Sequence, residues 1–268
     1  KLELWDRDNN IIKYVKGSEF FGDVSFLQND ENLGVKTNVH LVDGLYGDLL
    51  KPTTYEYIMN NLKYNINKAD LITADGAYGY NESDEDYQNQ EILHYSLFTA
   101  EILVALSSNK VGGHFVLKMF DLFTEYSVKL IYVLNSCYQS VKLYKPETSR
   151  NANSEKYIIC MNFTPPENID DIIAKLVIVH NEFYNKTTND ETLYNVVLDF
   201  EMPSDFIQSI KIFNDMFIKN QIYNIASGIQ IGSEIIHILE NNNYDINEVN
   251  KYIDNKNAVK TDITRLFI

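Results

Sequence analysis

The sequence predicts an α/β fold, with a parallel-type sheet covered by helices on both faces. Strand-like apolar runs alternate with helical runs along the chain, and alternation at these lengths is typical of parallel sheets with helical crossovers. An aspartate, a lysine and a glutamate stand at the ends of three strand-like runs, as Asp75, Lys118 and Glu155. Burying a charged side chain in a strand costs free energy unless a group of opposite charge lies nearby. Open α/β sheets bind ligands at the carboxyl ends of their strands. The three residues are therefore candidates for a site.

The first third of the chain carries short elements separated by glycines. We expect strands over 20–27 and 38–42, a loop over 43–48, a helix over 53–62 and a strand over 69–74. Pro52 opens this helix, because the first helical turn does not need the N–H that proline lacks. The strand over 69–74 ends at Asp75, directly before Gly76.

Longer elements follow in the rest of the chain. We expect an amphipathic helix over 88–107, a strand over 114–119 introduced by a glycine pair, a helix over 123–138, and strands near 141–144 and 157–161. A proline pair at 165–166 marks a boundary, after which the pattern is mostly helical. We therefore predict a sheet-containing domain over 1–164 and a helical C-terminal region over 165–268 that packs on it.

The composition favours an intracellular globular protein. Of the 268 residues, 45% are hydrophobic and 23% are charged, which is ordinary for a soluble domain. We find no apolar run of ~18 residues for a membrane span and no signal region at the start of the chain. The two cysteines, Cys137 and Cys160, lie in apolar runs, and we expect buried free thiols in a reducing, cytoplasmic compartment. No metal-ligand spacing is present, so no metal is expected.

The charge distribution restricts where a nucleic acid could bind. A net charge of −15 argues against a general polyanion binder, because nucleic-acid affinity depends largely on phosphate neutralisation. The acids gather over 82–86 and in the C-terminal region, whereas seven Lys and Arg face four acids between Lys110 and Lys156. We expect any RNA to bind within this segment. Tyrosine rings could stack on bases or on a cap guanine, but we expect most of the 19 tyrosines to be half-buried in the core.

Several motifs in this segment resemble a known family. Residues 118–124 (KMFDLFT), 145–150 (KPETSR) and 153–157 (NSEKY), with 74–76 (ADG) upstream, resemble the FtsJ-like 2′-O-ribose methyltransferases. The likeness is closest to the cap-specific mRNA methyltransferases of eukaryotes and large DNA viruses. It implies a Rossmann-like class I methyltransferase sheet followed by a mostly helical appendage. It also implies S-adenosyl-L-methionine as the cofactor and RNA, with capped mRNA favoured, as the substrate.

The resemblance further implies roles for individual residues. The family uses a Lys-Asp-Lys-Glu tetrad, and Asp75, Lys118 and Glu155 match its last three members. A lysine held between carboxylates can orient a ribose 2′-hydroxyl, stabilise the developing alkoxide and, if its pKa is lowered, accept the proton. Asp48 would accept a hydrogen bond from the adenine of the cofactor, and Asp75 would approach its methionine part. The implied substrate-binding residues are Ser149, Arg150 and Asn153, with Arg150 on a phosphate.

The start of the chain departs from the family pattern. Neither a glycine-rich cofactor loop nor the first tetrad lysine occurs before residue 26, and residues 1–13 resemble the end of the helix that follows that loop. We therefore expect a gap in the centre of the sheet, filled by an upstream segment or a separate polypeptide. In the alternative, residues 11–15 serve as a degenerate first strand. Either case leaves cofactor binding by this chain alone in question.

Simpler interpretations remain for each candidate. Asp75 and Asp48 are also ordinary turn residues, Lys118 could extend its ammonium to solvent, and Glu155 could pair on the surface with a neighbouring cation. A catalytically silent RNA- or protein-binding subunit and a ribosomal RNA methyltransferase are the alternative functions. The abundance of Asn, Ile, Lys and Tyr suggests an AT-rich genome, such as that of a large cytoplasmic DNA virus.

Overall fold

The computed structural model describes residues 2–6, 11–15, 38–42, 48–65, 68–76, 89–147, 149–150, 152–188 and 197–240. The chain divides into two compact units. The sheet unit comprises Lys1–Lys145 and Glu155–Ile210, and the tail unit comprises Pro146–Ser154 and Lys211–Ile268. The sheet unit continues beyond residue 164 because the next helix, over 169–188, packs on the helix over 95–108. The boundary at residue 164 between a sheet-containing domain and a helical region stays a prediction.

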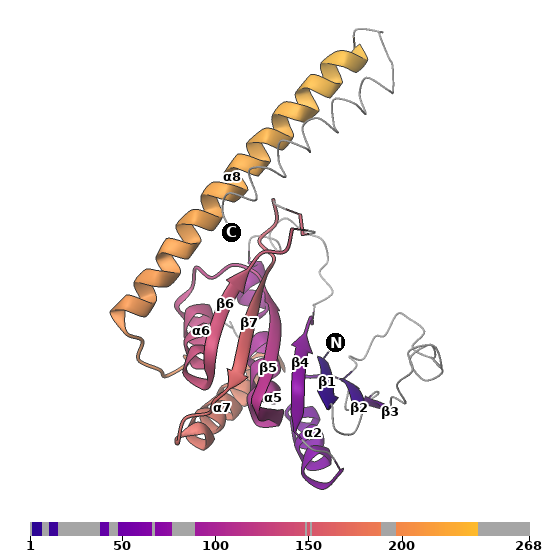
Figure 1. The fold of residues 1–268 in the computed structure, drawn as a ribbon, viewed down its shortest axis with the longest axis vertical. Helices are drawn as coiled ribbons and strands as arrows, with labels where there is room; N and C mark the ends of the chain where they lie inside the picture. Colours follow the sequence, from indigo (N-terminus) through magenta and orange to yellow (C-terminus); the bar gives the residue numbers. More distant parts are fainter. Residues whose placement is uncertain are drawn as a thin grey trace. The chain divides into compact units, whose positions relative to one another are not determined.

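The described residues of the sheet unit form a sheet of seven strands (Figure 1). Their order is β3-β2-β1-β4-β5-β7-β6. The bounds are β1 (Leu2–Asp6), β2 (Ile11–Val15), β3 (Asn38–Val42), β4 (Ala69–Ala74), β5 (Asn109–Met119), β6 (Tyr138–Tyr144) and β7 (Lys156–Phe163). Strands β4 and β5 are parallel, whereas β7 runs antiparallel to both β5 and β6. The predicted α/β fold and the strands expected from 38 onward are confirmed.

The first residues differ from the sequence-based expectation. Residues 1–13 were expected to end a helix, but the structure has strands β1 and β2 there, and β1 lies between β2 and β4. The alternation of Leu2, Glu3 and Leu4 has the period of two that favours a strand. The central gap that we expected is therefore absent from the described sheet, and residues 11–15 lie one position further out. The strand expected over 20–27 lies outside the described residues.

The direction of β1 also differs from the parallel first strand that the family pattern implies. Strand β1 runs antiparallel to β4, with Leu2 opposite Ala74 and Trp5 opposite Leu71. Its carboxyl end at Asp6 therefore points away from the edge at which β4 ends. A cofactor loop that followed a parallel first strand would begin at that edge, so β1 does not supply the start of such a loop.

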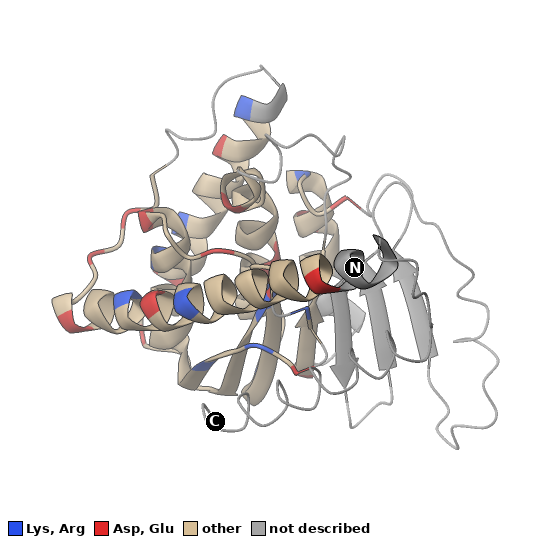
Figure 2. Cartoon of the chain, turned by 90° about the horizontal axis from the view of Figure 1, so that it is seen from above, with Lys and Arg blue, Asp and Glu red and all other residues tan. Residues whose placement is uncertain are grey.

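The described helices of the sheet unit pack on one face of the sheet (Figure 2). Helix α5 (Tyr95–Ser108) contacts β4 and β5, α6 (Glu125–Cys137) contacts β6 and β7, and α2 (Pro52–Asn65) and α7 (Ile169–Thr188) contact α5. Ile72, Phe115 and Leu117 are fully buried beneath this layer. Helical cover on the second face stays a prediction.

The helix expected over 88–107 differs from the prediction in two respects. It is interrupted at His94, which separates α4 (Gln90–Leu93) from α5, and the His94 ring hydrogen-bonds through Nδ1 to the carbonyl of Gln90 at 2.7 Å. Helix α5 is also buried nearly all round and not amphipathic. The sheet lies on one side of it and other helices on the other, which leaves no face for polar residues.

Both cysteines are free and buried, as predicted. Burial raises the pKa of the Cys137 thiol to about 12 and raises that of Cys160 as well. Neither thiol is therefore a nucleophile at neutral pH.

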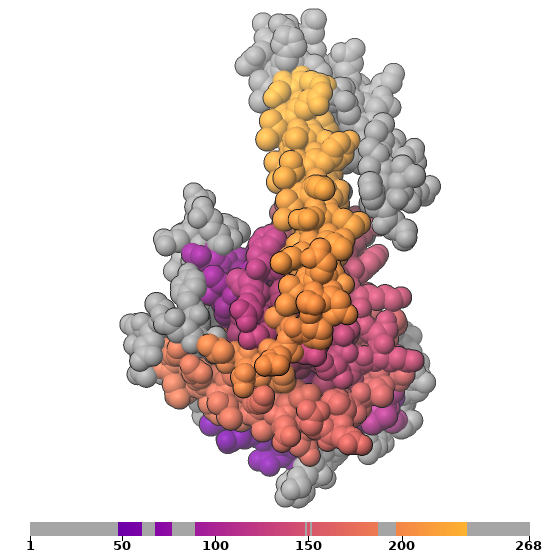
Figure 3. All heavy atoms as spheres, turned by 90° about the vertical axis from the view of Figure 1, so that its left-hand side faces the viewer, coloured from indigo at the N-terminus to yellow at the C-terminus, as the bar shows by residue number. Residues whose placement is uncertain are grey.

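The last of the described helices, α8 (Ser204–Glu240), begins in the sheet unit and continues in the tail unit. Its residues are the orange to yellow spheres of Figure 3. Several of its apolar side chains are exposed: Ile212, Met216, Ile222, Tyr223, Ile225 and Ile229. None of the described helices is long and apolar enough to span a membrane.

Candidate functional site

The three candidate residues meet at one edge of the sheet. Asp75 follows the last residue of β4, and Lys118 is the last residue but one of β5. Because these strands are parallel and Ala74 pairs with Leu117, Asp75 stands beside Lys118. Strand β7 runs the other way, with Lys156 opposite Met119, so Glu155 precedes β7 at the same edge. The convergence predicted from the sequence is confirmed.

The contact between the first two residues is an ion pair. The Lys118 ammonium contacts the Asp75 carboxylate. The lysine side chain is only 15% exposed, whereas the carboxylate is 59% exposed. The ammonium also lies 6.0 Å from the centre of the Phe120 ring, a distance at which a cation is attracted to an aromatic face. The lysine is thus held in one place by a carboxylate that a ligand can still approach.

Glu155 faces this pair across Tyr157. Tyr157 is opposite Lys118 in the register, and it interacts electrostatically with Glu155, which precedes β7. Burial raises the pKa of Tyr157; the Glu155 and Asp75 carboxylates raise it further, and Lys118 lowers it. One phenol therefore lies within electrostatic reach of all three candidate residues.

A fourth carboxylate, Glu101 on α5, contacts the residue that follows Asp75. Its side chain is fully buried, and Oε1 accepts a hydrogen bond of 2.9 Å from the backbone N–H of Gly76. A Cβ atom at Gly76 would lie 2.6 Å from this oxygen, so only glycine fits there. Burial raises the pKa of Glu101 to about 7, with the Gly76 N–H acting against the shift.

The sequence-based reasoning missed Glu101, although a signal was present. It is the one acid in the apolar run over 97–106. An acid that is placed inside a buried helix requires a local partner, and here the partner is the backbone N–H of Gly76, next to Asp75.

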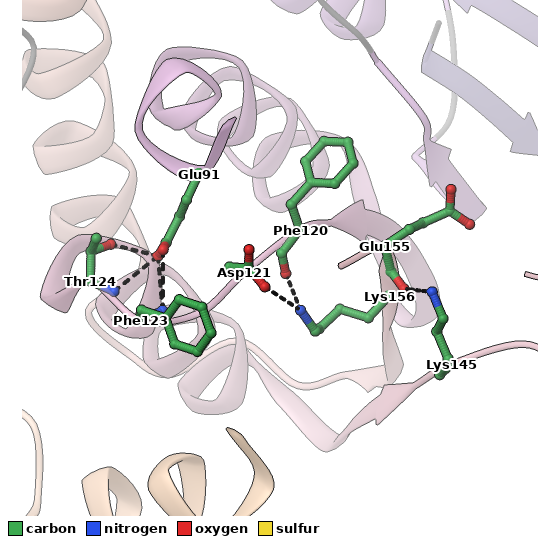
Figure 4. A network of polar contacts seen from close by, with 8 residues as sticks. All are labelled: Glu91, Phe120, Asp121, Phe123, Thr124, Lys145, Glu155 and Lys156. Carbon is green, nitrogen blue, oxygen red and sulfur yellow. Dashed lines mark hydrogen bonds and ion pairs between the residues drawn. The ribbon is translucent and has the colours of Figure 1, made fainter. Parts of the chain in front are cut away.

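The segment after Lys118 is fixed by a second buried glutamate (Figure 4). Glu91 on α4 is 7% exposed. Its carboxylate accepts hydrogen bonds from the backbone N–H groups of Phe123 and Thr124, at 3.1 and 3.0 Å, and from the Thr124 hydroxyl at 2.7 Å. The segment over 120–124 therefore follows β5 in a defined path.

Lys156 holds the beginning of that segment. Its ammonium is buried, donates to the backbone carbonyl of Phe120 and lies 3.8 Å from the Asp121 carboxylate. Burial lowers the pKa of Lys156 to about 8, and Asp121 opposes the shift. Figure 4 shows the Glu155 carboxylate and the Lys156 ammonium on opposite sides of the strand. The Lys145 ammonium donates a hydrogen bond of 2.6 Å to the Glu155 carbonyl.

The remaining candidates are Asp48, in the sheet unit, and three residues of the tail unit. Asp48 makes contacts within its own turn: Oδ1 accepts from the Leu50 N–H at 3.1 Å, and Oδ2 lies 3.8 Å from the Lys51 ammonium. These contacts are those of a turn residue that opens α2. The predicted substrate-binding residues Ser149, Arg150 and Asn153 lie in the tail unit. They form two successive turns, in which the Ser149 N–H donates to the Pro146 carbonyl and the Asn153 N–H donates to the Arg150 carbonyl.

Comparison with known proteins identifies the family. A family model described as "FtsJ-like methyltransferase" matches residues 23–163, which contain the whole cluster. The chain belongs to the FtsJ-like methyltransferases. Proteins of this family use S-adenosyl-L-methionine as the methyl donor.

Curated relatives carry names that refer to the mRNA cap. The cap-specific mRNA (nucleoside-2′-O-)-methyltransferase 1 of Caenorhabditis elegans is 32% identical over 218 residues, which are 80% of this chain and 21% of that protein. The mouse methyltransferase 1 is 38% identical over 67% of this chain and 20% of the relative. The methyltransferase 2 of Drosophila melanogaster is 32% identical over 71% of this chain and 27% of the relative. This FtsJ-like chain thus spans about a fifth to a quarter of the length of these relatives.

The described edge residues of this FtsJ-like domain fit the methyl donor. S-adenosyl-L-methionine carries positive charge on its sulfonium and amino groups, and the half-exposed Asp75 carboxylate at the carboxyl edge complements that charge. The Asp75 carboxylate thus pairs with Lys118 and stays exposed enough for a cationic ligand to approach it.

Proposed function

We propose that this chain is the catalytic domain of an S-adenosyl-L-methionine-dependent RNA 2′-O-ribose methyltransferase, and that the first transcribed nucleotide of capped mRNA is its target. The observation that carries the proposal is the Asp75–Lys118 ion pair at the sheet edge, with Glu155 beside it, inside the region that matches the FtsJ family. The proposal assigns to these residues the last three positions of the family tetrad.

In this proposal Lys118 acts on the ribose. Its ammonium is mostly buried and is held by Asp75, so it can donate to the 2′-oxygen and stabilise the alkoxide that develops during attack on the methyl group. Glu155 approaches from β7 and orients the hydroxyl. Because most of the rate gain in such a displacement comes from alignment, the supports at Glu91, Glu101 and Lys156 matter as positioning contacts.

The cofactor and the substrate are assigned to different residues. Asp48 and Asp75 would hold S-adenosyl-L-methionine, which supplies the methyl group when bound. Arg150, which is exposed in the tail unit, would contact an RNA phosphate, and Ser149 and Asn153 would accompany it. The seven Lys and Arg between 110 and 156 support an RNA substrate despite the net charge of −15.

The names of the relatives favour a cap substrate over ribosomal RNA. The relatives from the worm and the mouse are named cap-specific mRNA methyltransferase 1, and the relative from the fly is named cap-specific mRNA methyltransferase 2. The buried free cysteines support a reducing intracellular compartment for the reaction.

The experiment that tests the proposal is transfer of a labelled methyl group by the full-length protein. The substrates are RNA with a 7-methylguanosine cap, the same RNA without a cap, and capped RNA with a 2′-deoxy first nucleotide. We expect label only on the first substrate. Equal labelling of the deoxy RNA would exclude the first ribose as the target, and equal labelling of the uncapped RNA would favour a ribosomal RNA type of enzyme. Bound cofactor without any transfer would support the silent subunit.

A further inference from the structure

A row of side chains continues sideways from the proposed active-site lysine. In the register of the sheet, Lys118 on β5 is paired with Tyr157 on β7, and Tyr157 is paired with Tyr144 on β6. Paired residues on neighbouring strands point to the same face of a sheet. The strands are spaced by about 5 Å, which places Tyr144 about 10 Å from Lys118 along the row.

This row lies on the face of the sheet that the core does not use. The residues next to it in the strands, Leu117 and Ile158, point to the other face and are fully buried. Leu143 packs against the core from the same strand as Tyr144, whereas the rings of Tyr144 and Tyr157 are not among the residues packed on the described core. Core packing therefore does not account for the two tyrosines.

Exposure and charge along the row are suited to a nucleic acid. The Tyr144 side chain is 44% exposed at the carboxyl end of β6. Lys142, two residues earlier on the same face, is exposed too. An aromatic ring stacks on any base, and a neighbouring cation attracts the phosphate.

We propose that Tyr157 and Tyr144 form a stacking surface for single-stranded RNA, in which the base of the nucleotide next to the methylated one stacks on Tyr144. The proposal rests on the proposed function and adds a substrate subsite to it. RNA is the occupant because the row is continuous with Lys118, which faces the target ribose in that function. Tyr157, between the two, contacts the target nucleotide itself.

The test uses the full-length protein and removes the aromatic ring of Tyr144, the residue of the row that lies farthest from Lys118. Binding of a short capped RNA is measured by fluorescence anisotropy for the wild type, Tyr144→Ala and Tyr144→Phe, with Tyr57→Ala on α2 as the control for loss of a comparably exposed tyrosine. A second RNA lacks the base at the nucleotide next to the target. We expect Tyr144→Ala to weaken binding of the intact RNA by about 5- to 150-fold. Tyr144→Phe and Tyr57→Ala should bind as the wild type does.

The abasic RNA decides whether stacking is the cause. Wild type and Tyr144→Ala should bind it equally, since the base that the ring contacts is gone. An equal loss for intact and abasic RNA, or no loss for either, would overturn the proposal. In steady-state kinetics the same variant should raise KM and leave kcat unchanged. The binding measurement requires no methyl transfer, so an inactive protein that still shows the base-dependent difference would refute the proposed function and keep the stacking surface.

Discussion

The most informative perturbation is Glu101→Gln, because it changes a buried proton and little else. The amide keeps an acceptor oxygen for the Gly76 N–H, which is 2.9 Å from Oε1 in the wild type, and it has nearly the same volume. It differs in being neutral at every pH. The variant therefore separates the charge of Glu101 from its packing.

The sign of the effect follows from the direction of the pKa shift. Burial raises the pKa of Glu101 from 4.5 to about 7 in the folded protein. Between these values the folded state keeps the proton and the unfolded state releases it, so the free energy of unfolding falls as the pH rises. The contribution of protonated Glu101 to the free energy of unfolding is fully present below pH 4.5 and is lost above about pH 7. At 1.36 kcal/mol for each pH unit the loss amounts to about 3 kcal/mol.

The assay is urea unfolding of the wild type and of Glu101→Gln at pH 4.5, 6, 7 and 8, followed by far-ultraviolet circular dichroism. From the lowest to the highest pH, the free energy of unfolding of the variant should rise by about 3 kcal/mol relative to that of the wild type. Glu56→Gln, at an exposed position on α2, is the matched control and should keep a constant difference from the wild type. A constant difference for Glu101→Gln as well would refute a raised pKa at this position.

Three further predictions address the cofactor, the RNA and the loop supports. Asp48→Ala should weaken S-adenosyl-L-methionine binding by about 1–3 kcal/mol in calorimetry, while Asp48→Asn should retain the turn; unchanged affinity in the alanine variant would remove Asp48 from the cofactor site. Arg150→Ala should lower RNA affinity and reduce the slope of log K against log salt by about 1, and an unchanged slope would contradict a phosphate contact. Glu91→Ala leaves the Phe123 and Thr124 N–H groups without their carboxylate and should lower the free energy of unfolding by about 2–4 kcal/mol in urea; a loss below about 1 kcal/mol would show that these N–H groups find other partners.

Most of the sheet edge could be predicted from the sequence because its signals are local. The strand over 69–74 is a continuous apolar run that ends in Asp-Gly, and β4 has these bounds. Lys118 breaks an apolar strand, and its partner in the structure is the predicted Asp75. The family motifs then supplied Glu155, whose place at the same edge depends on β7 running antiparallel.

The features that were missed depend on tertiary contacts. Glu101 and Lys156 are charged residues whose partners are a backbone N–H and a backbone carbonyl far along the chain, at Gly76 and Phe120. Backbone partners have no signature in the sequence. The first strand was missed for another reason: the family pattern favoured a helix end there, while the local alternation around Leu2 and Leu4 favoured the strand that the structure contains.

The central claim is that Lys118 acts on the ribose and not on the cofactor. The most direct measurement compares the rate of methyl transfer to capped RNA with the Kd for S-adenosyl-L-methionine, for the full-length wild type and Lys118→Ala. We predict a loss of transfer of about 10²–10⁴-fold, with a Kd that stays within about a factor of two because the lysine makes no cofactor contact in this account. Transfer near the wild-type rate, or a Kd that weakens in parallel with the rate, would contradict the claim.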